Sequence, residues 1–317
     1  MKTINKIILF ALAIVTMSCE DIFEEDITND SVLIISPLNE SKVESNVVKF
    51  QWNSLKGTYN YRVQIYGANQ STILDSLVSK TNLTYPLKQG TYQWRVRGEN
   101  FAYQSSYSFP ATFSTVISED LTNQQVILSS PQNEIYVNFT NITFNWQSLP
   151  NATSYSVEVI NIINGQQIYL KSAITGISVT LNIPNLADGI YEWRVKAKNG
   201  TTETLQYAGR KFSMDTVIAN QPQNVTPANN SLQIINQKVS FTWTIATDSG
   251  TVQAPISYKI EFSNNENFTT ISQTSNASST TFQQTFSTAG IYFWRIKAID
   301  QAGNVSVASA PYKFTIN

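Results

Sequence analysis

The sequence has no histidine and a single cysteine among its 317 residues. Without an imidazole, the chain lacks the usual base that activates a serine or cysteine nucleophile, and it lacks the commonest metal ligand. One thiol forms neither an intramolecular disulfide nor a cysteine-type zinc site, and we find no glycine-rich phosphate loop. We therefore predict that the protein is not an enzyme and has no cofactor.

Charged residues are also scarce, at 14% of the chain, and the net charge is −1. A nearly neutral chain has no bulk attraction to nucleic acid, so we expect no nucleic-acid partner. The acidic residues outside the N-terminal region are few and scattered, so the sequence does not indicate the paired carboxylates of a glycosidase active site. The turn Asp300–Asn304 offers one carboxylate, a poor cage for calcium, so we predict no metal site.

The apolar run near the N-terminus, Ile7 to Val15, is shorter than the roughly 20 residues that cross a membrane. Lys2 and Lys6 precede this run and Cys19 follows it, a pattern typical of an export signal over residues 1–18. Because Cys19 lies where a lipoprotein signal ends, we predict that it is acylated and anchors a lipoprotein. An acylated N-terminal cysteine carries more than one acyl chain, which is enough for stable membrane binding. The alternative is an ordinary secretory signal with an incidental cysteine.

Six of the eleven residues from Glu20 to Asp30 are acidic and none is basic. A segment this polar and charged is typical of a solvated, flexible tether. We therefore expect residues 19–30 to link the lipid anchor to the first folded part of the chain.

The body of the chain is a threefold repeat. The motif Tyr-x-Trp-Arg-aliphatic-basic-small begins at Tyr92, Tyr191 and Tyr292. Its period-2 alternation predicts a β-strand with one buried and one solvated face. A strand with Phe-x-Trp precedes each copy, a third apolar strand lies between them, and Pro37, Pro131 and Pro227 open the repeats 94 and 96 residues apart.

Each repeat resembles a fibronectin type III domain, with a departure at Trp94, Trp193 and Trp294, where that family more often has an aliphatic residue. The resemblance covers roughly residues 31–317. It implies an all-β protein of three tandem β-sandwiches, at 31–115, 122–214 and 220–317. It also implies a tyrosine corner in each, with Leu87 and Gly90, Leu186 and Gly189, and Phe286 and Gly290.

The six tryptophans alternate with polar residues along their strands, so we predict that all six are core residues. The alternative is an exposed aromatic platform for sugars. Arg95, Arg194 and Arg295 lie on the opposite, solvated face. We predict the cross-strand pairs Glu158–Arg194 and Glu261–Arg295, each worth at most about 1 kcal/mol. Gln64 takes the corresponding place in the first repeat, so Arg95 should lack a carboxylate partner.

Acidic residues directly after Cys19, at Glu20, Asp21, Glu24 and Glu25, resemble the surface-export signal of Bacteroidetes lipoproteins. This resemblance implies a lipid anchor in the outer membrane with the protein facing the cell exterior. The alternative is an anchor that faces the periplasm. Three Asp-Ser/Thr-aliphatic triplets resemble the O-glycosylation motif of secreted proteins from the same group, and they mark Ser31, Ser76 and Thr216.

One connection is rich in aromatic residues. Phe101, Tyr103 and Tyr107 follow the Tyr-x-Trp strand of the first repeat, and rings in such a loop provide a ligand platform. The alternative is that one or two of them pack onto the edge of the core. We predict a membrane-anchored, non-catalytic binding or adhesion module for a glycan or an extracellular partner. The alternative is a structural spacer or accessory subunit of an outer-membrane assembly, with no small ligand.

Overall fold

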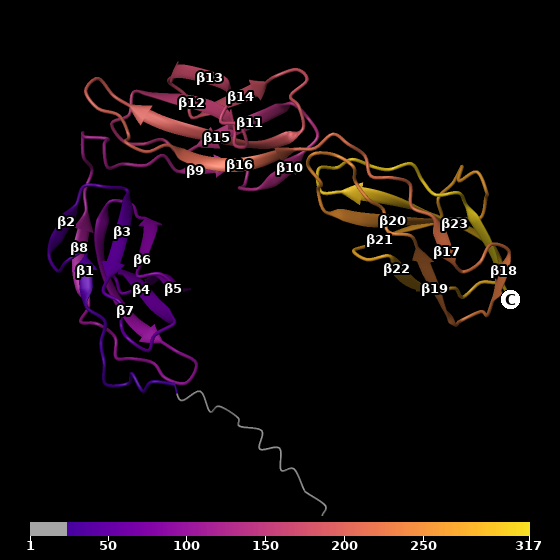
Figure 1. Ribbon diagram of the computed structural model, residues 1–317, viewed down its shortest axis with the longest axis horizontal. Helices are drawn as coiled ribbons and strands as arrows, with labels where there is room; N and C mark the ends of the chain where they lie inside the picture. Colours follow the sequence, from indigo (N-terminus) through magenta and orange to yellow (C-terminus); the bar gives the residue numbers. More distant parts are fainter. Residues whose placement is uncertain (1–23) are drawn as a thin grey trace, which may run out of the picture. The chain divides into compact units, whose positions relative to one another are not determined.

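The computed structural model describes residues 24–317, and all regular elements within that range are β-strands. The predicted all-β fold of tandem sandwiches is therefore confirmed (Figure 1). No helix in the described range is long and apolar enough to cross a membrane. Cys19, Glu20 and Asp21 lie outside the described residues.

The strands fall into three sets of eight (Figure 1). The first sandwich contains β1 (Ile34–Ser36), β2 (Ser41–Val43), β3 (Val47–Trp52), β4 (Asn60–Gly67), β5 (Thr72–Val78), β6 (Asn82–Pro86), β7 (Gly90–Glu99) and β8 (Ala111–Thr115). The second contains β9 (Leu128–Ser130), β10 (Ile135–Val137), β11 (Asn141–Trp146), β12 (Ser154–Asn161), β13 (Gln167–Ile174), β14 (Ser178–Asn182), β15 (Gly189–Lys198) and β16 (Ala208–Met214). The third contains β17 (Asn224–Thr226), β18 (Ser231–Gln233), β19 (Lys238–Trp243), β20 (Ile256–Ser263), β21 (Gln273–Ala277), β22 (Thr281–Thr285), β23 (Gly290–Asp300) and β24 (Tyr312–Ile316).

Every sandwich has the same two sheets. A three-stranded sheet has the orders β1-β3-β6, β14-β11-β9 and β17-β19-β22. A five-stranded sheet has the orders β2-β8-β7-β4-β5, β10-β16-β15-β12-β13 and β18-β24-β23-β20-β21. The short first strand of each larger sheet runs parallel to its neighbour, and the other pairs are antiparallel. The described residues form two compact units: residues 24–43 with 47–116, and residues 44–46 with 117–317.

The predicted tryptophan core is confirmed. All six side chains are buried, with exposed fractions from 0% to 4%, so the alternative of an exposed platform built from them is wrong. In the first sandwich Trp52 on β3 and Trp94 on β7 come from opposite sheets, and their ring centroids lie 6.3 Å apart. Burying a large apolar side chain contributes about 1.5–3 kcal/mol, so the two tryptophans of each sandwich supply much of its core energy.

The three tyrosine corners also form. In each sandwich the tyrosine hydroxyl donates a hydrogen bond to the carbonyl oxygen four residues earlier. The bonds are Tyr92 to Lys88 at 2.8 Å, Tyr191 to Ala187 at 2.7 Å and Tyr292 to Thr288 at 3.0 Å.

Part of the expected tether packs against the first sandwich. Ile27 is fully buried, and the Asp26 carboxylate accepts hydrogen bonds from the backbone and hydroxyl of Thr28. The same arrangement recurs in Glu119-Asp120-Leu121-Thr122, where Leu121 is fully buried and Asp120 bonds to Thr122. Residues 25–28 therefore have a structural counterpart in residues 119–122, and the expectation of a solvated, flexible tether is wrong for these four residues.

Candidate functional site

The outer face of each larger sheet carries a repeated polar cluster, which we call the arginine site. It consists of an arginine on the Tyr-x-Trp strand, the residue opposite on the neighbouring strand, and an aromatic ring over the guanidinium. The strand register places Gln64 opposite Arg95, Glu158 opposite Arg194, and Glu261 opposite Arg295.

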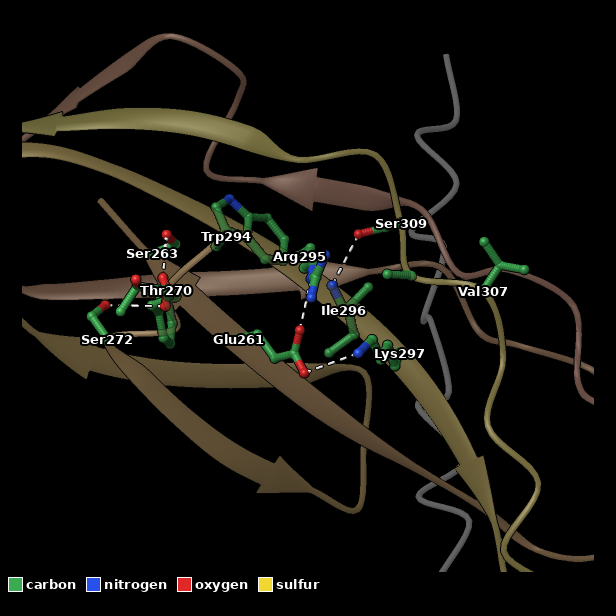
Figure 2. A network of polar contacts seen from close by, with 12 residues as sticks. Glu261, Ser263, Thr270, Ser272, Trp294, Arg295, Ile296, Lys297, Val307 and Ser309 are labelled. Carbon is green, nitrogen blue, oxygen red and sulfur yellow. Dashed lines mark hydrogen bonds and ion pairs between the residues drawn. The ribbon is translucent and has the colours of Figure 1, made fainter. Parts of the chain in front are cut away.

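Figure 2 shows the arginine site of the third sandwich, with the Glu261 carboxylate between Arg295 and Lys297. Glu261 Oε2 accepts from Arg295 Nε at 2.6 Å, and Oε1 accepts from Lys297 Nζ at 3.1 Å. The guanidinium carbon of Arg295 lies 4.2 Å from the centre of the Phe268 ring. Burial disfavours the ionised form of Glu261, but the hydrogen bonds and charges of Arg295 and Lys297 outweigh burial and lower its pKa.

The second sandwich repeats this geometry. Arg194 Nε donates to Glu158 Oε1 at 2.5 Å, and Gln167 donates to the other carboxylate oxygen. The Tyr207 ring centre lies 4.6 Å from the Arg194 guanidinium carbon. Burial raises the pKa of the Tyr207 phenol, and the Glu158 charge adds to this effect.

Both predicted Glu–Arg pairs are therefore confirmed, but the expectation that they face solvent is wrong for the carboxylates. The Glu158 and Glu261 side chains are only 6% and 3% exposed, because the arginine and the neighbouring long side chains cover them. Removing one partner of such a shielded pair would leave a buried charge unpaired, so we expect that change to cost more than the roughly 1 kcal/mol of an exposed pair.

The first sandwich has the same arrangement with a neutral acceptor. Arg95 Nε donates to Gln64 Oε1 at 2.9 Å, Arg95 Nη2 donates to the Tyr66 hydroxyl at 3.2 Å, and the Tyr107 ring centre lies 4.1 Å from the guanidinium carbon. Within residues 24–317 no carboxylate oxygen lies within 4.0 Å of an Arg95 nitrogen, as predicted.

The carboxylates closest to this face pair with other arginines. Asp75 accepts from Arg62 Nε at 2.6 Å, and this hydrogen bond lowers the pKa of Asp75. Glu99 lies 2.7 Å from Arg97 Nη2. Arg62 and Arg97 each have a carboxylate partner, whereas Arg95 has no direct counterion among the described residues.

The three aromatic residues of the first-sandwich loop do not form a single platform. The Phe101 side chain is 87% exposed, and its ring packs against Tyr59, with centroids 5.0 Å apart. Tyr103 is 37% exposed. Tyr107 lies instead on the sheet face over Arg95 and Arg97, and burial raises its pKa. The ring contact between Phe101 and Tyr59 joins two loops at one end of the sandwich, and it was not predicted from the sequence.

One asparagine orders this loop. The Asn100 side-chain oxygen accepts from the backbone of Ala102 and Tyr103, and its amide donates to the carbonyls of Glu25 and Gly57. Asn100 therefore holds the aromatic end of the sandwich next to the N-terminal segment.

Three carboxylates converge at the start of the third sandwich. One oxygen from each of Asp215, Asp248 and Asp300 lies within 4.8 Å of the others. Burial raises the pKa of Asp215, and the charges of Asp248 and Asp300 add to it. We expected a single carboxylate at the Asp300 turn, and this expectation is wrong because the linker and a second loop bring Asp215 and Asp248 close to Asp300. Oxygen donors of this kind are those that calcium takes.

The predicted glycosylation residues have different surroundings. Ser31 is exposed and pairs in an isolated bridge with Ser106. Ser76 lies within β5, opposite Val63, and is partly buried. Thr216 is exposed, and its hydroxyl donates to Asp188 at 2.8 Å.

Residues 132–206 match the family described as a secretion system C-terminal sorting domain. The matched residues run through the second sandwich, from just before β10 to the connection after β15. Such a match indicates a protein that is secreted, exposed at the cell surface or associated with the outer membrane. No curated protein matches the sequence.

Three solved structures are similar to the chain at low sequence identity. The chicken CNTN1 FN1-FN3 domains are 12% identical, with 90% of this chain and 97% of that chain covered and a TM-score of 0.42. The fibronectin(III)-like modules of Clostridium thermocellum CbhA are 14% identical, with 58% and 94% covered and a TM-score of 0.23. Domains A168-A170 of titin are 14% identical, with 90% and 99% covered and a TM-score of 0.35.

Proposed function

We propose that the protein is a lipid-anchored, surface-exposed and non-catalytic binding module for a glycan or another extracellular partner, and that its first sandwich makes the contact. The sorting-domain match supports export. The position of Cys19 after an export signal and before an acidic segment supports an outer-membrane lipid anchor that faces the exterior.

The observation that carries the proposal is the exposed aromatic pair Phe101 and Tyr59. Their side chains are 87% and 50% exposed, and their rings contact each other at 5.0 Å. The connection that contains Phe101 has counterparts after β15 and β23. Among the described residues, these counterparts expose the aliphatic side chains of Leu205, Val305 and Val307 and no aromatic ring. Adjacent exposed rings offer the flat apolar surface on which a sugar or a protein hot spot packs.

The proposed lipid anchor limits how far from the membrane the aromatic pair can contact a partner. The six Cα-to-Cα steps from Cys19 to Glu25 span at most about 21 Å when extended, and Asn100 donates to the Glu25 carbonyl beside the aromatic pair. With Cys19 acylated, the pair stays close to the membrane surface. The partner is therefore a molecule found at that surface, such as a cell-surface glycan.

The test is binding of the exported part of the chain, residues 20–317, to a glycan array. Phe101→Ala should lower binding at least tenfold. It should not change the melting temperature, because the Phe101 side chain is mostly exposed to solvent. Leu205→Ala, in the matching loop of the second sandwich, is the control and should leave binding unchanged. Absence of any ligand, with co-purification of membrane proteins from the native host, would favour the spacer or accessory-subunit alternative.

A further inference from the structure

The three arginine sites form an internal comparison. Each arginine donates its Nε hydrogen to the same position on the neighbouring strand, at 2.9, 2.5 and 2.6 Å in the three sandwiches. Each guanidinium also lies against an aromatic ring. The acceptor is a carboxylate in the second and third sandwiches and an amide in the first, so the first site keeps the geometry and loses the counterion.

Gln64 orients Arg95 without neutralising it. Its Oε1 accepts from Arg95, and its Nε2 donates to Asp75 Oδ2 at 2.9 Å. Asp75 in turn bonds to Arg62 at 2.6 Å. Of the five N–H groups of a guanidinium, two on Arg95 find acceptors within residues 24–317. The remaining donors belong to the planar fork that matches a carboxylate with two parallel hydrogen bonds.

The groups around Arg95 indicate what carries that carboxylate. The groups that surround the Arg95 guanidinium, the Tyr66 hydroxyl, the Gln64 amide and the Tyr107 ring, are neutral and bonded to one another or to arginines. They add no second charge, so they suit a ligand whose single carboxylate is flanked by neutral groups. Arg62 and Arg97 already hold Asp75 and Glu99, so a sugar unit that itself carries several negative charges would meet two carboxylates beside the site. One negative charge flanked by neutral hydroxyls fits better.

We infer that the Arg95 site of the first sandwich binds the carboxylate of a uronic acid in an acidic polysaccharide. The inference rests on the proposed function, since it names the chemistry of the glycan. The remaining N–H donors of Arg95 hold the carboxylate, and Gln64 and Tyr107 fix the guanidinium plane. The Tyr66 hydroxyl donates to Gln64 Oε1 at 2.7 Å and accepts from Arg95 at 3.2 Å, so it helps to hold both side chains in place.

The test is affinity electrophoresis of the full-length chain in gels that contain polygalacturonate, alginate or hyaluronan, with neutral dextran and poly-glutamate as comparisons. At least one uronate polymer should retard the protein, and added salt should reduce the retardation. Arg95→Gln should lower the affinity at least tenfold. Arg194→Gln, at the matching position of the second sandwich, is the control and should not. Gln64→Glu should also lower it, because it supplies the counterion present in the other two sites.

Retardation by none of the three uronate polymers, or retardation unaffected by Arg95→Gln, would overturn the inference. Equal retardation by poly-glutamate would assign the site to an acidic peptide and overturn the glycan assignment. Failure here is distinguishable from failure of the proposed function. If Phe101→Ala abolishes glycan binding and Arg95→Gln leaves it unchanged, the proposed binding module stands and only the uronate site is excluded. Thermal melting of each variant checks that the first sandwich remains folded.

Discussion

Replacing Glu261 by glutamine tests whether the buried carboxylates stabilise their sandwiches. Glu261 is 3% exposed and accepts hydrogen bonds from Arg295 at 2.6 Å and Lys297 at 3.1 Å. Hydrogen bonds to charged groups contribute about 1.5–3 kcal/mol each. The amide keeps one acceptor oxygen, worth about 1 kcal/mol, and it avoids part of the desolvation cost of a buried charge. We therefore expect Glu261→Gln to lower the free energy of unfolding of the third sandwich by about 2 kcal/mol at pH 7.

The pH dependence of this difference has a definite sign. The pKa of Glu261 is lowered in the folded protein, so its stabilising contribution is present above the unfolded pKa of about 4.3. The contribution is lost as the pH falls through the lower, folded pKa. Urea unfolding of both proteins at pH 7 and in acid measures it. A difference below about 0.5 kcal/mol at pH 7, or one that does not shrink in acid, would refute the reasoning.

Four further results are expected. Trp193→Ala should cost about 3–5 kcal/mol and bring the second sandwich close to unfolding, since the ring is fully buried and stacks on Phe144 at 4.6 Å; an unchanged melting curve would contradict its core role. Tyr103→Ala should leave the melting of the first sandwich almost unchanged, because that side chain is 37% exposed; a drop of several degrees would show that it is packed. Cys19→Ala should release the protein from the membrane fraction or leave an unprocessed precursor, whereas normal partitioning of a processed mutant would exclude a lipid anchor. Neutralising Glu20, Asp21, Glu24 and Glu25 should protect the protein from protease added to whole cells, while neutralising Glu119 and Asp120, the matching pair before the second sandwich, should not; equal cleavage in both would leave the acidic segment as a linker.

Strand features were predictable from the sequence because a period of two determines which side chains share a face. Counting from Trp193 along its strand put Arg194 outward, and the same count on the neighbouring strand put Glu158 opposite it. The alternation does not reveal how deeply long neighbouring side chains cover such a pair. The burial of Glu158 and Glu261 was therefore missed.

Loop contacts were not predictable in this way, because they depend on where non-periodic segments return in space. Phe101 meets Tyr59 across two loops. Asp215 and Asp248 reach Asp300 from a linker and a different connection. One signal was available and overlooked: Glu25-Asp26-Ile27-Thr28 is repeated as Glu119-Asp120-Leu121-Thr122, which marks the true start of the repeat before its proline.

The central claim is that the first sandwich is the ligand-binding part of an exported module. Residues 24–43 with 47–116 form one compact unit, and residues 44–46 with 117–317 form the other, so fragments 24–116 and 117–317 separate the two except for residues 44–46. The most direct measurement is the dissociation constant of each fragment for the glycan that the 20–317 chain binds. The account predicts that fragment 24–116 retains the affinity of the longer chain and that fragment 117–317 shows none. Binding confined to fragment 117–317 would contradict it.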